Sequence, residues 1–144
     1  MKINFKIVTP EKVVIEKEIS QATIPTVDGQ ITILPNHRSY IAGLKAGEIV
    51  VKCAEGEGRG KDKTDCAMAV SGGFVEFADN KLVILADTAE RAEDLDLARA
   101  EEAKKQAEEL MKRKIADDTQ YALVAAQLEK ELARIRVAKK WRKL

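Results

Sequence analysis

Two patterns of hydrophobic residues divide this chain of 144 residues into two parts. From Ile3 to Ala86, apolar residues alternate with polar ones in short runs, which is typical of strands with one buried face. From about Asp94 onward, apolar residues recur every three or four positions, as they do along one face of an amphipathic helix. The change predicts a β domain followed by a helical one.

Turn signals separate the strand signals of the first part. Asp28-Gly29, Gly72-Gly73 and Asp79-Asn80 are dipeptides that tolerate positive φ, and each stands between two apolar runs. Eight or more short strands at such close intervals favour a β-sandwich or barrel with an aliphatic core. The expected strands are, in order, 3–7, 13–19, 21–25, 30–34, 48–53, 66–71, 74–78 and 81–86.

The second part predicts two helices joined by a short connection at 114–118, which together form an antiparallel hairpin. Asp94 is the expected N-cap of the first helix and Asp117 or Asp118 that of the second. The expected buried stripes are Leu97, Ala100, Ala103, Ala107, Leu110, Met111 and Ile115 in the first helix, and Tyr121, Val124, Ala125, Leu128, Leu132 and Ile135 in the second.

The predicted fold is therefore α+β with two domains. Residues 1–88 form an N-terminal β-sandwich, residues 89–144 form a C-terminal helical hairpin, and Leu85–Glu93 is the hinge between them. The first helix offers mostly alanine, and burial of a methyl group stabilises far less than burial of a leucine side chain. We therefore expect a hairpin that separates at modest cost.

Charge differs along the chain although the total is nearly balanced, with 25 basic and 24 acidic residues. The first helix is acidic at its start, whereas the last segment, 134–144, is basic and contains no acidic residue. Antiparallel pairing of the helices would bring these opposite charges together, although exposed attraction is weak. The six basic residues of the last segment are Arg134, Arg136, Lys139, Lys140, Arg142 and Lys143.

This basic end has two interpretations. A cationic helix can bind an acidic partner surface or nucleic acid phosphates, and it can also be a solvated helix end whose cations suit the helix dipole. The balanced total charge argues weakly against a general nucleic-acid binder. Because no signal peptide and no apolar run of about 20 residues is present, we expect a cytosolic protein that reaches a membrane only through a partner.

Candidate catalytic chemistry is sparse. The glycine-rich loop 55–64 departs from the P-loop pattern because Glu55 replaces the first glycine and Asp62 follows Lys61. His37 is the single histidine, and Cys53 and Cys66 lack the partners of a zinc site. A disulfide between the two cysteines is conceivable, but reduced thiols are favoured in the cytosol. We expect no catalytic residue, no metal site and no required cofactor.

Three phrases, read in order, resemble one family over nearly the full chain: KIVTPEKVV, GQITILPNHRSYIAGLKAGEIVV and AVSGGFVEFADNKLVILADTAERAEDLD. They are similar to the epsilon subunit of bacterial F-type ATP synthase. The resemblance implies a non-catalytic rotor subunit on the cytoplasmic side of the membrane, with a sandwich that binds the gamma subunit and the c-subunit ring. Contacts with the c ring are implied near Gly29, Gln30 and His37.

The resemblance also implies regulation through the hairpin. In an extended state the basic helix would reach the alpha/beta catalytic head and impede ATP hydrolysis. Residues 95–100 match the (Ile/Leu)-Asp-x-x-Arg-Ala motif through which some members bind ATP. The residues implied in weak regulatory ATP binding are Glu90, Leu95, Asp96, Arg99, Ala100, Lys130 and Arg134.

Two features of the chain bear on this implied nucleotide site. Gln106 and Lys130 stand where tightly binding members carry arginine, and lysine lacks the bidentate fork of arginine. Two other functions stay open at this point. One is a stand-alone ATP sensor, and the other is a nucleic-acid-binding β domain with a basic helical arm.

Overall fold

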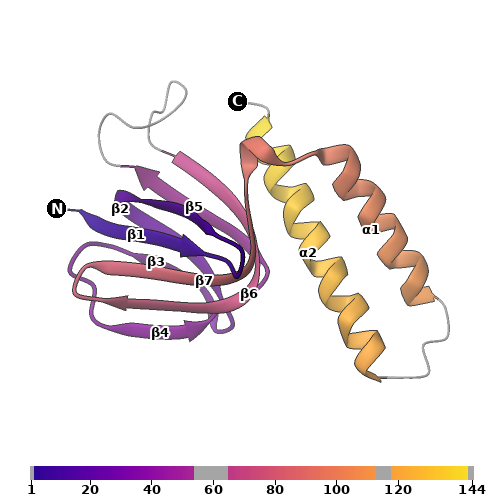
Figure 1. The fold of residues 1–144 in the computed structure, drawn as a ribbon, viewed down its shortest axis with the longest axis horizontal. Helices are drawn as coiled ribbons and strands as arrows, with labels where there is room; N and C mark the ends of the chain where they lie inside the picture. Colours follow the sequence, from indigo (N-terminus) through magenta and orange to yellow (C-terminus); the bar gives the residue numbers. More distant parts are fainter. Residues whose placement is uncertain (1, 54–64, 113–117, 143–144) are drawn as a thin grey trace.

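The computed structural model describes residues 2–53, 65–112 and 118–142. Its described part has a β domain followed by two helices, which confirms the predicted fold class (Figure 1). The elements are β1 (Ile3–Val8), β2 (Val13–Thr26), β3 (Gly29–Ile33), β4 (Tyr40–Gly43), β5 (Gly47–Cys53), β6 (Asp65–Ala78), β7 (Lys81–Arg91), a 3-10 turn η1 (Ala92–Asp94), α1 (Leu97–Lys112) and α2 (Asp118–Arg142).

The strands pair in a ring, which makes the sandwich a flattened barrel. β1, β7, β6, β5 and β2 pair in this order, and an additional antiparallel pairing of β1 with β2 closes the ring. Outside the ring, β3 pairs with β2 and β4 pairs with β6. The pairing of β1 with β7 is parallel, and the other pairings are antiparallel. Closure of this kind leaves few exposed strand edges.

Two long bent strands connect the layers, and here the predicted strand count was wrong. β6 runs unbroken through Gly72 and Gly73, which have φ values of +55° and +118°. Its side chains in the sandwich core lie at even positions (Met68 and Val70) before these glycines and at odd positions (Val75 and Phe77) after them. β2 changes its buried positions in the same way near its register shift. Each change in the buried face interrupts the alternating pattern of the sequence, so the pattern predicts two strands where the structure has one.

Two strands also differ from their predicted extents. β4 is absent from the prediction because its four residues show no alternation of buried and exposed positions. β7 continues past the predicted end at Ala86, and Arg91 still pairs with Met68 of β6. Strand pairing therefore occupies most of the stretch Leu85–Glu93 that the sequence predicts as a hinge.

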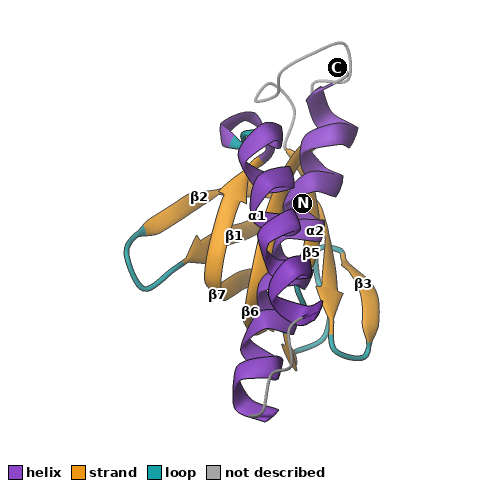
Figure 2. Cartoon of the chain, turned by 90° about the vertical axis from the view of Figure 1, so that its right-hand side faces the viewer, coloured by secondary structure: helices purple, strands orange, loops and turns teal. Residues whose placement is uncertain are grey.

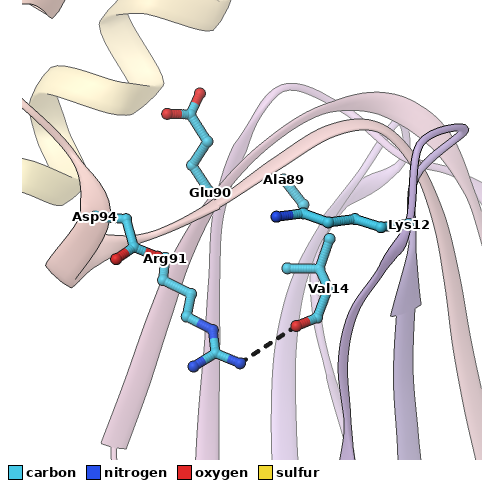
Figure 3. A pocket seen from close by; sticks show the side chains of 6 residues that line it. All are labelled: Lys12, Val14, Ala89, Glu90, Arg91 and Asp94. Atoms are coloured by element: carbon cyan, nitrogen blue, oxygen red, sulfur yellow. Dashed lines mark hydrogen bonds between the residues drawn. The ribbon is translucent and has the colours of Figure 1, made fainter.

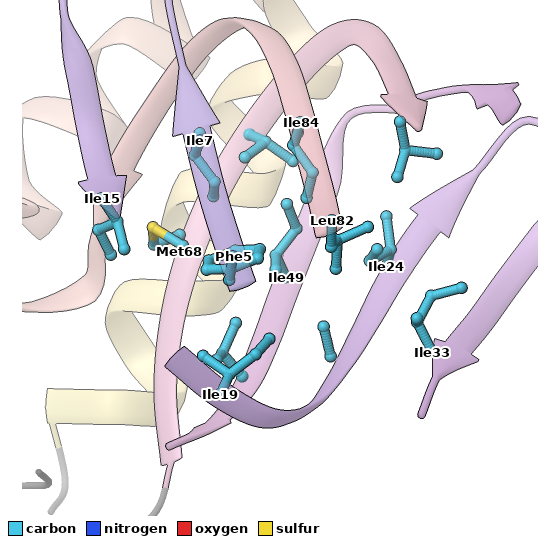
Figure 4. Close-up of a cluster of buried hydrophobic side chains, with 14 of the residues drawn as sticks. Phe5, Ile7, Ile15, Ile19, Ile24, Ile33, Ile49, Met68, Leu82 and Ile84 are labelled. Atoms are coloured by element: carbon cyan, nitrogen blue, oxygen red, sulfur yellow. The ribbon is translucent and has the colours of Figure 1, made fainter. Parts of the chain in front are cut away.

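The core between the layers is mainly isoleucine, as Figure 4 shows, with Phe5, Phe77 and Met68 among the fully buried side chains. This agrees with the aliphatic core expected from the alternating pattern. Burial of each large side chain contributes roughly 1.5–3 kcal/mol. The sandwich is consequently the stable platform of the molecule, and it carries the hairpin on one side (Figure 1).

The helices form the predicted antiparallel hairpin, with α2 between α1 and the sheet (Figures 1 and 2). A second apolar cluster joins α2 to the sheet: Ala67 and Ala69 of β6 pack with Leu95, Val137 and Ala138. Because α2 has neighbours on two sides, a single stripe does not describe its buried residues. Leu132 and Tyr121 were predicted to be buried and are instead 39% and 50% exposed.

The start of α1 also differs from the prediction. Asp94 belongs to the turn η1, and Asp96 is the residue that caps the helix. The alanine-rich seam is present, since Ala100 and Ala107 are the buried residues of α1, while Leu110 is 46% exposed. The glycine-rich loop 55–64, Ile115 and Asp117 lie outside the described residues.

Cys66 is half-buried on β6. It lies opposite Val51 in the pairing of β5 with β6, and Lys17 donates a hydrogen bond of 3.4 Å from Nζ to its Sγ. The expectation of reduced thiols stays a prediction. The side chain of Cys53 lies outside the described part.

Candidate functional site

The motif at residues 95–100 shapes the start of α1. Oδ1 of Asp96 accepts a hydrogen bond of 3.3 Å from the backbone N–H of Arg99, so Asp96 is the N-cap of the helix. Leu95 is 1% exposed in the second apolar cluster, and Ala100 is fully buried. Leu95, Asp96 and Ala100 thus have structural roles of their own, while the side chain of Arg99 is exposed.

Arg134 of α2 connects the helical hairpin to the β domain. Its Nη2 donates a hydrogen bond of 3.0 Å to Oε2 of Glu90 at the end of β7, and its Nε lies 3.0 Å from Oε1 of the same carboxylate. The Nε–H is buried and is not directed along a hydrogen bond, so the contact at Nε is ionic only. Two of the residues implied in nucleotide binding, Glu90 and Arg134, therefore contact each other directly.

Glu131 is part of the same cluster, although the sequence analysis did not single it out. Its Oε2 accepts a hydrogen bond of 2.9 Å from Nη1 of Arg134, and its Oε1 accepts one of 2.7 Å from Nε2 of Gln127. Glutamate with an arginine three positions later is a common surface pair on helices, so spacing alone would not reveal its burial.

Two other basic residues of α2, Lys139 and Lys140, contact acids in this folded form. Nζ of Lys140 lies 3.0 Å from Oε1 of Glu48 on β5, and Nζ of Lys139 lies 3.8 Å from Oε1 of Glu101 on α1. The contact between Lys139 and Glu101 confirms the expected approach of the acidic start of α1 to the basic end of α2. Arg136 is exposed, whereas the side chain of Arg142 and all of Lys143 lie outside the described part.

A shallow hollow of about 300 Å³ lies beside the end of β7 (Figure 3). It is lined by Lys12, Val14, Ala89, Glu90, Arg91 and Asp94. Glu90 is the one residue of the implied nucleotide set in this lining, and its side chain points away from that of Arg91, which donates a hydrogen bond of 3.2 Å to the carbonyl oxygen of Val14. Lys130 is half-buried on α2 and is absent from the lining.

The residues implied in c-ring contact lie at opposite ends of β3. Gly29 (φ +116°) and Gln30 begin the strand, after a turn in which Oγ1 of the buried Thr26 donates to the carbonyl oxygen of Gly29 over 2.6 Å. His37 lies beyond the end of β3, half-buried, with ring centroids 5.8 Å from Phe77 and 6.1 Å from Tyr40. Packing therefore orients the His37 ring.

The loop that carries His37 is tied to the turn between β6 and β7. Asn80 accepts a hydrogen bond of 2.6 Å at Oδ1 from the backbone N–H of Asn36, and its Nδ2 donates one of 3.0 Å to Oδ1 of Asn36. Both residues have positive φ, at +64° for Asn36 and +57° for Asn80. The Asn36–Asn80 pair therefore fixes the loop that carries His37 relative to the turn between β6 and β7.

An apolar surface on β4, β6 and β7 was missed by the sequence analysis. Ile41, Phe74 and Leu85 are 72%, 61% and 54% exposed. Phe74 lies opposite Leu85 in one pairing and opposite Gly43 in the other, and Gly43 shares its face of β4 with Ile41. These three residues, the sheet patch, form one outward apolar surface. Alternation alone marks them as exposed strand positions, but it does not show that they lie together.

Other chemistry is not evident within the described ranges. No group of three or more His, Cys, Asp or Glu residues is placed there to hold a metal ion. No helix in the same residues has the length and apolar character needed to cross a membrane.

The fold and the cluster around Arg134 together define a class: a β-sandwich subunit with an attached helical hairpin. Residues 2–92 match the family model for the β-sandwich domain of the ATP synthase delta/epsilon chain, and residues 93–139 match the model for its long α-helix domain. The chain belongs to the ATP synthase epsilon chain family.

Individual relatives agree with this assignment. The chain is 39% identical over 142 residues to the ATP synthase epsilon chain of Dehalococcoides mccartyi, an alignment that covers 99% of this chain and 96% of the relative. It is 44% identical over 106 residues to the epsilon chain of Lactiplantibacillus plantarum, covering 74% and 71% of the two chains.

Solved structures share the fold. A chain in the cryo-EM structure of the Euglena gracilis mitochondrial ATP synthase, described as OSCP/F1/c-ring, matches with a TM-score of 0.73 at 19% identity, covering 92% of this chain and 78% of that one. A chain in the Tetrahymena thermophila central stalk and c-ring structure matches with a TM-score of 0.62 at 18% identity, covering 97% and 96%. At these identities the likeness concerns the fold.

Proposed function

We propose that this chain is a non-catalytic subunit of the central stalk of an F-type ATP synthase, on the cytoplasmic side of the membrane. It would link the gamma subunit to the c-subunit ring and restrain ATP hydrolysis through its hairpin. The observation that carries this proposal is the division of the sandwich surface into a region covered by α2 and a separate, exposed sheet patch. The presence of a central stalk and c ring in the assemblies with the same fold supports it.

The sheet patch is the surface that fits the gamma subunit. Ile41, Phe74 and Leu85 are each more than half exposed on neighbouring strands, and clustered exposed apolar residues mark protein interaction surfaces. The hairpin covers the first half of β6 through Ala67 and Ala69. A partner on the patch would therefore not need to displace the hairpin.

The two ends of β3 fit the c ring. Val27, beside Gly29, is 64% exposed, and Leu34, before His37, is 51% exposed. Each implied contact thus has an exposed apolar neighbour, and the pairs Thr26–Gly29 and Asn36–Asn80 hold the two turns. Ordered turns bind with less loss of conformational entropy than mobile ones.

The hairpin fits a regulatory role because its cations are neutralised in the folded form. Arg134, Lys139 and Lys140 each contact a carboxylate of β7, α1 or β5. If α2 leaves the sheet, Arg134 separates from Glu90 and Lys140 separates from Glu48. The freed cations would then be available to an acidic surface of the alpha/beta catalytic head, where the extended helix would impede hydrolysis.

Weak regulatory ATP binding at the folded hairpin is the second part of the proposal. Arg99 is exposed next to the Asp96 cap, and Arg134 lies beside Glu90 at the end of β7. These two arginines are the candidates for phosphate contact, with Lys130 as a further cation. ATP bound there would stabilise the folded form by mass action.

Co-purification with the gamma subunit tests the docking function. Phe74→Asp should abolish co-purification, because it places a carboxylate within the apolar patch. Leu123→Asp is the matched control, since Leu123 is 67% exposed on α2 and outside the patch, and it should leave co-purification unchanged. Retention of gamma by Phe74→Asp would contradict the assignment, and a stand-alone ATP sensor would show no gamma association in either form.

A further inference from the structure

Glu131 is the charged residue that the fold buries most completely among the residues described. Its side chain is 2% exposed, while the side chain of Glu90 is 32% exposed and that of Arg134 is 19% exposed. An ionised carboxylate is costly to bury unless it is paired and hydrogen-bonded. The hydrogen-bond and ionic partners of the Glu131 carboxylate must therefore account for its burial.

Both oxygens of the Glu131 carboxylate are occupied from its own helix. Gln127, one turn earlier, donates to Oε1 over 2.7 Å, and Arg134, three residues later, donates to Oε2 over 2.9 Å. The amide of Gln127 orients the carboxylate, and the carboxylate in turn directs the guanidinium of Arg134. Both contacts lie within α2, so neither requires the hairpin to be docked on the sheet.

The guanidinium of Arg134 is consequently held between two acids. Nη1 faces Glu131 on α2, while Nη2 and Nε face Glu90 on β7. The planar fork of arginine suits this arrangement, because its nitrogens present donors along separate edges. The three side chains carry one positive and two negative formal charges, so the cluster already has an excess of negative charge around its single cation.

A phosphate that approached Arg134 would meet this excess. To form the bidentate contact that makes arginine a strong phosphate ligand, it would need an edge of the guanidinium that a carboxylate now uses. It would also come close to the second carboxylate, and like charges repel strongly where water is excluded. Glu90 is 32% exposed at the hollow, whereas Glu131 is enclosed.

We propose that Glu131 is an internal anion that competes with phosphate for Arg134 and so sets the low affinity of the folded hairpin for ATP. This inference rests on the ATP binding of the proposed function and identifies the residue that limits it. It makes Glu131 a specificity-determining residue of the site, although Glu131 lies outside the motif at residues 95–100.

Calorimetric titration of the full chain with ATP tests the inference. Glu131→Gln keeps the shape and the contact with Gln127 but removes the charge, and it should bind ATP at least tenfold more tightly than the unaltered chain. Combining it with Arg134→Ala should abolish the gain, and this double variant leaves no buried carboxylate without its partner. Glu129→Gln on the exposed face of α2 is the control for net charge, and its affinity should match that of the unaltered chain.

The possible outcomes distinguish failure of the role proposed for Glu131 from failure of the proposed ATP binding. If Glu131→Gln binds as the unaltered chain does while Arg99→Ala binds more weakly, the ATP site stands and the role of Glu131 is overturned. If no variant binds ATP, both are overturned. If Glu131→Gln does not fold, Glu131→Ala serves in its place, with thermal unfolding measured for each variant. An equal gain in Glu129→Gln would also overturn the inference, because net charge would then be sufficient.

Discussion

Arg134 and Glu90 lie 44 positions apart in the sequence, and Nη2 of the arginine donates a hydrogen bond of 3.0 Å to Oε2 of the glutamate. Glu90 stands near the end of the last strand, and Arg134 stands in the C-terminal half of α2. This contact joins the hairpin to the sandwich directly. The other side of the same guanidinium is held by Glu131.

The first prediction concerns the unequal effect of removing each partner of this contact. Arg134→Ala should destabilise the docked hairpin by about 3 kcal/mol, because it leaves the buried Glu131 without its cation. Glu90→Gln should cost about 1 kcal/mol or less, since Glu90 is partly exposed and Arg134 keeps Glu131. Amide exchange at Val137 and Ala138 measures the docking locally.

Lys139→Ala provides the control for this comparison. Its side chain and that of its partner Glu101 are 59% and 52% exposed, so its removal should change exchange at Val137 by well under 1 kcal/mol in free energy. Equal effects of Arg134→Ala and Lys139→Ala would show that burial of Glu131 does not govern docking.

The second prediction concerns the boundary at which the hairpin can be removed. A chain that ends at residue 92 should fold and bind gamma, because it keeps the whole of β7. A chain that ends at Thr88 loses Ala89 from the core and the pairings of Glu90 and Arg91 with β6. It should unfold at a temperature several degrees lower. Circular dichroism and gamma co-purification measure the two properties.

Both truncated chains should lose inhibition of ATP hydrolysis, since neither contains the basic helix. Undiminished inhibition by the chain that ends at residue 92 would show that the sandwich, not the hairpin, restrains hydrolysis.

The third prediction concerns the loop that carries His37. Asn80→Gly removes both hydrogen bonds to Asn36 while it permits the positive φ at this position. Amide exchange over residues 34–39 should therefore accelerate with little loss of global stability. Asp79→Gly is the matched control, because Asp79 also has a positive φ of +51° but is exposed at the neighbouring position. Slow exchange in Asn80→Gly would mean that packing of His37 alone holds the loop.

The fourth prediction separates steric conflict from backbone strain at two glycines. A methyl group at Gly73 would collide with the backbone carbonyl oxygen of Leu85, whereas one at Gly29 would meet nothing within 4 Å. Both positions have strongly positive φ, which costs of order 1–3 kcal/mol for other residues. Gly29→Ala should lose about that amount. Gly73→Ala should lose clearly more or fail to fold, as judged by thermal unfolding.

The helices show how far sequence periodicity reaches. Ile135 was expected to be buried and is 9% exposed, but Leu132 is 39% exposed while Glu131 is buried. A stripe repeated at helical spacing assumes one neighbouring surface. Since α2 packs against both α1 and the sheet, its buried residues extend around the helix to Val137 and Ala138, which the single stripe does not include.

The candidate site was likewise predicted only in part from the sequence. The motif at residues 95–100 was visible in the sequence, but its capping role was not, because Asp96 caps α1 where Asp94 was predicted to do so. Arg134 and Glu90 could be selected from the sequence only through the family resemblance. Their mutual contact and its link to Glu131 depend on which part of α2 packs beside the end of β7. No local sequence pattern determines that position.

The sequence by itself determined the two hydrophobic patterns, the order of the β and helical parts and membership in the epsilon chain family, because these depend on residues close in the chain or on phrases in a fixed order. The tertiary structure decided which side of α2 is buried, where the sheet patch lies and how Arg134 is shared between two acids. Each of these depends on the approach of segments that are distant in sequence. Burial then turns an ordinary helical pair, Glu131 and Arg134, into part of a charge cluster that also includes Glu90.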